Sequence, residues 1–280
     1  MTSQKISTLK YLSSLKFLLV LVGCISSPIL FAKNINDDEL TADEIVVKAS
    51  LASYYGGNDG RTMARMKIVD ANGRTQLRQF TILRKDVEEG GKQKFLVVFS
   101  RPTDVAGTVF MVHKKPGSQD DRWLYLPALD LVKRISAGDK RTSFVGAHYF
   151  YEDVSGRSPD EDKHELVMES EAFYQMRHTP KEPTSVEFSY YLTWIDKKTF
   201  LPVKIQYFDA SNKATRLIEA VETINVQGIP TVVRAKVSNL TDGSYTLMEF
   251  KKMTYDLGID EDVFTESALR NPPKKWLDFN

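Results

Sequence analysis

The 280-residue sequence contains a single cysteine, Cys24, and no excess of charge of either sign. With one cysteine, neither an intrachain disulfide nor a cysteine-based zinc site can be built. The 38 Lys and Arg residues are balanced by 37 Asp and Glu residues, so the chain lacks the broad positive field that non-specific nucleic-acid binding requires. We therefore expect no nucleic-acid partner.

Motifs for nucleotide binding, serine hydrolysis and zinc proteolysis are also missing. The sequence has no Gly-x-Gly-x-x-Gly or Gly-x-x-x-x-Gly-Lys-Ser/Thr segment, no Gly-x-Ser-x-Gly elbow and no His-x-x-x-His spacing. The one pair that could indicate a hydrolase is His148 with Glu152, which would share a face of a helix. A surface ion pair or helix cap is the alternative interpretation. We expect no enzymatic activity, no cofactor and no metal.

Residues 1–32 have the pattern of a secretory signal peptide. Three lysines precede an apolar stretch over residues 17–25, and the sequence turns polar after Ala32. The apolar stretch is shorter than the ~20 residues that a membrane-spanning helix needs. One alternative is a lipobox at Leu21-Val22-Gly23-Cys24, in which Cys24 would be lipidated, and another is an uncleaved anchor. The signal peptide and the lipobox both predict an exported protein.

Alternation of apolar and polar residues predicts an antiparallel β protein that follows one N-terminal helix. Thr41 and Glu44 form a capping-box pattern at the start of this helix. The turn signals Asn72-Gly73 and Asp242-Gly243 predict hairpins between neighbouring strands. About ten strands at short spacing cannot remain a flat open sheet, so the sheet is expected to curl or split.

The predicted domain covers residues 33–265. One segment inside it lacks the strand pattern, and a second segment follows it. Residues 144–156 place aromatic side chains among acids and glycines, and we interpret them as a short helix or plug over the sheet. Residues 144–151 are the candidate lid. Its expected hinges are Gly138, Gly146 and Gly156. Residues 266–280 are predicted to form a C-terminal tail that docks lightly or not at all.

Aromatic residues are plentiful, with 15 Phe, 12 Tyr and 3 Trp, and many lie in or near the predicted strands. A curled sheet with an aromatic inner face can enclose an apolar cavity of the size of a small ligand. Filling the protein core is the alternative role for any one of these side chains. The candidates for lining a lipid cavity are Phe95, Phe99, Phe110, Trp123, Tyr125, Phe144, Phe150, Tyr151, Tyr190 and Tyr207.

Several short segments occur together in one known family. They are Phe99-Ser100-Arg101-Pro102-x-Asp104-x-x-Gly107-Thr108-x-Phe110, Asp121-Arg122-Trp123-Leu124-Tyr125-Leu126-Pro127, Arg134-Ile135-Ser136, Ser143-Phe144-x-Gly146, Tyr151-Glu152-Asp153 and Phe200-Leu201-Pro202-Val203-Lys204. Over residues 40–260 the sequence resembles the outer-membrane lipoprotein-sorting family (LolA-like). The branch that it resembles most has members that accompany exporters of the resistance-nodulation-division (RND) type.

This resemblance implies a mostly β (α+β) fold, in which a curled antiparallel sheet forms an incomplete β-barrel with helices that plug the concave face. It also implies a periplasmic, non-enzymatic carrier that binds an acyl chain of a lipid or lipoprotein and transfers it toward the outer membrane. The alternative function is a periplasmic adaptor that docks on an RND-type inner-membrane transporter and binds no lipid. The sorting chaperones close their cavity with an arginine, which we cannot match to one position in this sequence.

Overall fold

The structure is a computed structural model that describes residues 39–278 of the chain. The leader predicted over residues 1–32, with Cys24, lies outside the described residues. The chain divides into two units, Met1–Glu39 and Leu40–Asn280, and the description that follows concerns the second unit. Among the described residues, no helix has both the length and the apolar character needed to cross a membrane.

Most of the second unit is β-strand, with a few short helices. The strands are β1 (Asp59–Val69), β2 (Thr75–Asp86), β3 (Gln93–Arg101), β4 (Val109–Lys114), β5 (Asp121–Leu126), β6 (Leu131–Arg134), β7 (Asp162–Glu169), β8 (Phe173–Pro180), β9 (Tyr190–Asp196), β10 (Pro202–Phe208), β11 (Ala214–Val226), β12 (Ile229–Asn239) and β13 (Tyr245–Tyr255). The α-helices are α1 (Ala42–Tyr54), α2 (Tyr151–Ser155), α3 (Glu266–Arg270) and α4 (Lys274–Leu277). Single 3-10 turns are η1 (Pro127–Leu129), η2 (Ala137–Asp139), η3 (Pro159–Glu161), η4 (Pro183–Ser185) and η5 (Glu261–Phe264).

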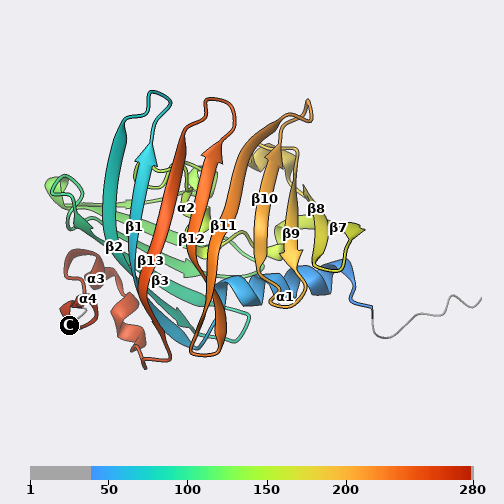
Figure 1. The fold of residues 1–280 in the computed structure, drawn as a ribbon. Helices are drawn as coiled ribbons and strands as arrows, with labels where there is room; N and C mark the ends of the chain where they lie inside the picture. Colours follow the sequence, from blue (N-terminus) through green and yellow to red (C-terminus); the bar gives the residue numbers. More distant parts are fainter. Residues whose placement is uncertain (1–38, 279–280) are drawn as a thin grey trace, which may run out of the picture. The chain divides into compact units, whose positions relative to one another are not determined.

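The strands form one antiparallel sheet in the order β6-β5-β4-β3-β2-β1-β13-β12-β11-β10-β9-β8-β7. Two meanders, β1 to β6 and β7 to β13, therefore meet where β1 pairs with β13. The sheet curls, so that β3 crosses behind β13 and β12 in Figure 1. Its edge strands, β6 and β7, do not pair with each other. This arrangement confirms the predicted incomplete barrel.

Helix α1 begins where the sequence predicted. Thr41 N donates to Glu44 Oε2 at 2.7 Å, and Glu44 N donates to Thr41 Oγ1 at 3.3 Å, which completes the capping box. The buried face of the helix includes Ile45, which packs with Met176 of β8 and Ile195 of β9. Helix α1 thus covers the inner side of the β8–β9 end of the sheet.

The connection between the two edge strands fills part of the concave side of the sheet. Within it, residues 143–156, which we call the plug, form a bridge between Ser143 and Phe150 and then helix α2. Phe144 and Tyr151 of the plug belong to the main hydrophobic core, together with side chains from β1 to β5 and β13. The predicted helical plug on the concave face is therefore confirmed.

The C-terminal segment, residues 259–277, packs on the opposite face of β2 to β5. Phe264 and Leu269 are fully buried, and Trp276 is 9% exposed. They share a hydrophobic cluster with Leu96 of β3 and Met111 of β4. The prediction of a lightly docked tail is therefore wrong, because apolar residues of this segment cover the outer face of the first meander.

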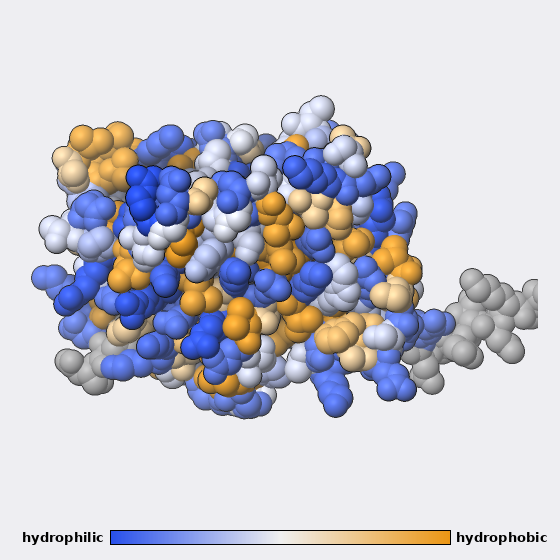
Figure 2. Space-filling view, turned by 45° about the horizontal axis from the view of Figure 1, so that its top comes forward, coloured by the Kyte–Doolittle hydropathy of each residue, from blue (hydrophilic) through white to orange (hydrophobic). Residues whose placement is uncertain are grey.

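The outer surface is mixed in character on the face drawn in Figure 2. There, hydrophobic side chains form separate patches between hydrophilic ones. Exposed large apolar side chains include Leu129 in η1 and Val221 in β11, which lie in different meanders. Such scattered apolar residues are normal for a soluble surface.

Candidate functional site

An apolar cavity of about 320 Å³ lies on the concave side of the sheet. Its wall combines the end of α1, the plug, strands β1 to β3 and strands β10 to β13. Cavities that bind small ligands have volumes of ~300–1,000 Å³, so this cavity is of ligand size. It reaches the end of the sheet where the β11–β12 hairpin turns, since Pro230 at the start of β12 is part of its wall.

Strand alternation makes this wall apolar. In each strand every second side chain points to the concave face. Ile82 of β2 pairs with Val97 of β3, and Ile205 of β10 pairs with Ile218 of β11, and all four contribute to the wall. Ala220 of β11 lies opposite Ala235 of β12 in the same wall. The small alanine pair leaves open space where larger residues would fill the sheet face.

The plug closes the cavity on its inner side through Phe144. This residue is only 2% exposed, and its ring lies 5.3 Å from Phe110, 5.7 Å from Phe99 and 6.4 Å from Phe80, measured between centroids. Tyr151 adds an edge-on contact at 5.6 Å. Because contacts between aromatic rings add to the effect of burial, this cluster holds the plug in the core. The candidate lid is thus a packed segment in the structure.

A buried carboxylate fixes the other side of the plug. Glu152 of α2 is 1% exposed and contacts Arg141 at 2.6 Å, Lys140 at 2.8 Å and Arg157 at 3.3 Å. Burial alone would raise the pKa of Glu152, but the three cations outweigh it and lower the pKa to about 2. The carboxylate is therefore ionised at neutral pH, and the plug is tied to three basic side chains.

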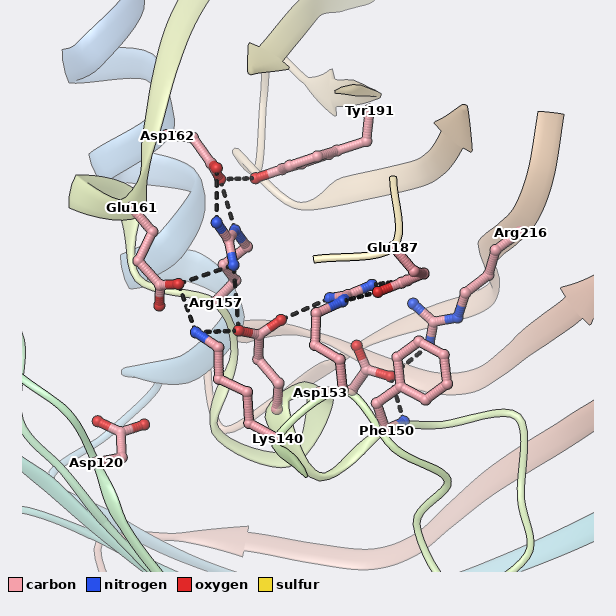
Figure 3. A network of polar contacts seen from close by, with 12 residues as sticks. Asp120, Lys140, Phe150, Asp153, Arg157, Glu161, Asp162, Glu187, Tyr191 and Arg216 are labelled. Carbon is pink, nitrogen blue, oxygen red and sulfur yellow. Dashed lines mark hydrogen bonds and ion pairs between the residues drawn. The ribbon is translucent and has the colours of Figure 1, made fainter. Parts of the chain in front are cut away.

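The same cations connect the plug to the second meander, as Figure 3 shows. Arg157 contacts Glu161 at 2.8 Å and binds both carboxylate oxygens of Asp162, each at 2.8 Å. Tyr191 of β9 donates a hydrogen bond to Asp162 at 2.8 Å. Arg141 also pairs with Glu187 at 2.6 Å. Such a network loses several favourable contacts when one member is removed.

A second ion pair joins the plug to β11. Arg216 pairs with Asp153 of α2, and the same guanidinium donates to the carbonyl of His148 at 3.1 Å. It also lies 4.2 Å from the centre of the Phe150 ring, which Figure 3 shows beside it. Charged and aromatic contacts of one arginine thus hold the N-terminal part of the short helix and the residues that precede it.

Close contact between α1 and the plug depends on a glycine. Gly156 ends α2 with a φ of +76°, and a Cβ atom at this position would lie 2.4 Å from the ring of Tyr54. Only glycine adopts this backbone conformation without strain and leaves space for the ring. Arg84 of β2 then fixes the end of α1, because its guanidinium donates to the carbonyls of Tyr54, Gly56 and Gly57.

Two of the ten aromatic candidates, Phe95 and Phe144, contribute to the cavity wall. Phe99, Phe110 and Tyr151 lie in the core around Phe144 and do not form part of that wall. Contact of any of these residues with a lipid stays a prediction.

The other five candidates lie in four different places. Trp123 and Tyr125 pack with the C-terminal segment on the outer face of the sheet. Phe150 lies against the guanidinium groups already described, and Tyr207 packs in a separate cluster with neighbouring aromatic rings. Tyr190 stacks on Phe208 at 4.7 Å. Successive strand residues point to opposite faces, so residue type alone does not select the cavity side.

Aliphatic side chains form much of the wall, and the search for aromatic residues missed them. Those not proposed from the sequence include Ile82, Val97, Ile205, Ile218, Met248 and Met253. Alternation along each strand was the signal that could have found them. This alternation identifies the wall residues only when one residue of each strand is known to face inward.

His148 and Glu152 do not form the pair that a hydrolase would need. Helix α2 begins at Tyr151, so the two residues do not share a helical face. The ring nitrogens of His148 hydrogen-bond with Thr246 at 2.8 Å and Ser244 at 2.7 Å. Burial lowers the pKa of His148. Within the described residues no group of three or more His, Cys, Asp or Glu side chains could hold a metal ion.

Comparisons with known proteins agree with this architecture. A family model described as that of an uncharacterized protein matches residues 91–271. A crystal structure of a DUF1329 family protein from Desulfovibrio piger is 28% identical, with a TM-score of 0.75, over 81% of this chain and 97% of that chain. No curated protein matches the chain.

Two further crystal structures share the fold at lower identity. One is a domain from Vibrio parahaemolyticus assigned to outer-membrane lipoprotein sorting, 24% identical, with a TM-score of 0.75 over 82% of this chain and 98% of that chain. The other is a LolA superfamily protein from Nitrosomonas europaea, 16% identical, with a TM-score of 0.63 over 82% of this chain and 99% of that chain. Both have the incomplete barrel in common with this protein.

Proposed function

We propose that this chain, which belongs to the family whose model matches residues 91–271 and which shares its fold with a LolA superfamily protein, is a periplasmic carrier of acyl chains. It binds an acyl chain of a lipid or lipoprotein in the cavity and carries it toward the outer membrane. The observation that supports this most directly is the cavity of about 320 Å³ with its aliphatic and aromatic wall. Each methylene moved from water into such a site contributes ~0.8 kcal/mol, so even part of a chain binds well.

The proposed carrier works by binding and release alone. Most side chains of the cavity wall are apolar, and in this proposal they supply burial and shape. Export by a signal peptide over residues 1–32 belongs to this proposal, with lipid attachment at Cys24 as the minority alternative. An RND-type inner-membrane transporter is the proposed protein partner.

The test fills the cavity with a side chain of the protein itself. Ala220→Trp adds an indole to the wall opposite Ala235, whereas Glu219→Trp adds the same indole to the other face of β11. We expect the Ala220 variant to lose uptake of a fluorescent fatty acid at least tenfold and the Glu219 variant to keep it. Far-UV circular dichroism confirms folding, and Ala220→Leu serves if the larger substitution does not fold. Equal uptake by both variants would contradict the proposal.

The adaptor hypothesis makes a different prediction for the same variants. An adaptor that binds no lipid would keep its transporter interaction and its phenotype in Ala220→Trp. Substitution of Phe144 by Asp is less suitable for this purpose, because Phe144 is 2% exposed and a buried charge would unfold the plug. Transporter capture by pull-down, combined with lipid uptake, therefore separates the two hypotheses.

A further inference from the structure

We infer that the cavity takes one acyl chain with about a dozen buried carbon atoms, and that its natural ligand is a single-chain amphiphile such as a fatty acid or lysophospholipid. This inference rests on the proposed function and specifies its ligand. The walls of the cavity are fixed by the core and by the ion pairs of the plug, so its volume limits how much chain it can bury.

The volume of the cavity limits the length of the acyl chain that it can bury. An apolar cavity of ~150 Å³ in another protein holds one benzene molecule, which has six carbon atoms. The cavity of about 320 Å³ is roughly twice as large and so has space for about a dozen carbon atoms. Two chains of ordinary phospholipid length need several times this volume. A lipid with two or three long chains would leave most of its apolar surface in water.

Enlargement of the cavity would require movement of the plug. Phe144 is packed against Phe80, Phe99 and Phe110, and movement of such an aromatic side chain out of the core would leave a cavity and lose these contacts. Glu152 is held by three cations and Asp153 by Arg216. Displacement of the plug would break both sets of contacts at once. A guest that fits the existing space binds without this cost.

The residues of the cavity wall indicate where the acyl chain lies. Ala220 and Ala235 pair across β11 and β12, and both line the cavity. Their short side chains leave a path along the sheet that passes Ile218 and Met248. The cavity reaches Gly56 and Pro230, which lie in or beside the turns at one end of the sheet. The polar head of the ligand is therefore expected at this end, with the methyl end toward Phe144.

A chain-length series measures the limit directly. Saturated fatty acids of 8 to 18 carbons, kept below their critical micelle concentrations, displace a fluorescent fatty acid from the full-length mature protein. We expect the affinity to increase about fourfold per methylene until about 12 carbons and then to level off. Native mass spectrometry is expected to show one fatty acid per protein and no complex with a diacyl phospholipid.

Variants of the alanine pair should change the chain length at which the affinity levels off. Ala235→Leu adds three carbon atoms to the wall, so the levelling-off is expected about three carbons earlier. Lys236→Leu places the same leucine side chain on the opposite face of the same strand, outside the cavity wall, and serves as the matched control. An equal shift in both variants would show that the limit does not arise in the cavity.

The outcomes separate the inference from the proposed function. If affinity continues to increase through 18 carbons, or a diacyl lipid binds as tightly as a single chain, the inference is wrong while the carrier function stands. If no fatty acid or lysophospholipid of any length binds, both are wrong. A plateau near 12 carbons that moves in Ala235→Leu alone supports the inference.

Discussion

Replacement of Glu152 by glutamine tests whether the buried ion pairs stabilise the plug. Glu152 is 1% exposed, and its pKa is lowered from 4.5 to about 2 although burial opposes ionisation. A shift of this size corresponds to about 3 kcal/mol of stability at pH 7. Loss of one partner from a buried ion pair costs ~3–5 kcal/mol, so both estimates agree. We expect Glu152→Gln to lower the free energy of unfolding by about 3 kcal/mol at neutral pH.

The pH dependence of this effect has a defined sign. A carboxylate with a lowered pKa contributes its full stabilisation above pH 4.5 and loses it as the pH falls toward 2. The difference between wild type and Glu152→Gln should therefore be constant from pH 7 to about pH 5 and roughly halved by pH 3. Urea unfolding followed by tryptophan fluorescence at several pH values measures both quantities.

A surface pair provides the control. Glu222 contacts Arg234 at 3.4 Å, with both side chains more than 40% exposed, and Glu222→Gln is expected to change stability by less than ~1 kcal/mol. A loss of under 1 kcal/mol in Glu152→Gln, or a loss that is the same at pH 7 and pH 3, would refute the assigned role of the network.

Two further predictions concern other parts of the fold. Leu269→Ala removes a fully buried side chain of the C-terminal segment and should cost ~2–5 kcal/mol in urea unfolding, whereas Leu129→Ala at a 70% exposed position should cost little; equal losses would contradict the docking of this segment. Burial lowers the pKa of Lys114 from 10.5 to about 8. Between these two pH values the unfolded chain binds more protons than the folded protein. The free energy of unfolding of the wild type should therefore rise as the pH increases from 8 to 10.5. Lys114→Met should lack this rise, and its free energy of unfolding at pH 7 should be up to about 3 kcal/mol higher than that of the wild type. A lower free energy of unfolding at pH 7 would show that the contacts of Lys114 with Ser155 and Tyr54 outweigh the cost of its burial.

Local features were readable from the sequence because neighbouring residues determine them. The capping box at Thr41 and Glu44 needs only a four-residue pattern, and the hairpins at Asn72-Gly73 and Asp242-Gly243 need only a turn between alternating strands. Glycine at both turns has a positive φ, as such turns require. The curled sheet followed from the number of strands, and its incomplete closure from the resemblance.

Contacts between segments that are distant in the sequence could not be predicted from the sequence. The partners of Glu152 include Arg141 and Arg157, which the sequence spaces as ordinary surface charges. Arg216, the partner of the neighbouring Asp153, comes from β11, which is distant in the sequence. The docking of Leu269 depends on an outer sheet face that only becomes visible once strands are paired. The aromatic candidates were chosen by residue type, whereas membership of the cavity wall depends on the direction of each side chain.

The pairing of β1 with β13 has a consequence for how the chain is made. Synthesis delivers β1 early and β13 near the end, and the strands between them form two local hairpin series. Until the last strands arrive, β1 keeps one bare backbone edge, which can recruit strands of other molecules. The yield of native protein should thus depend on how quickly the final quarter of the chain is delivered.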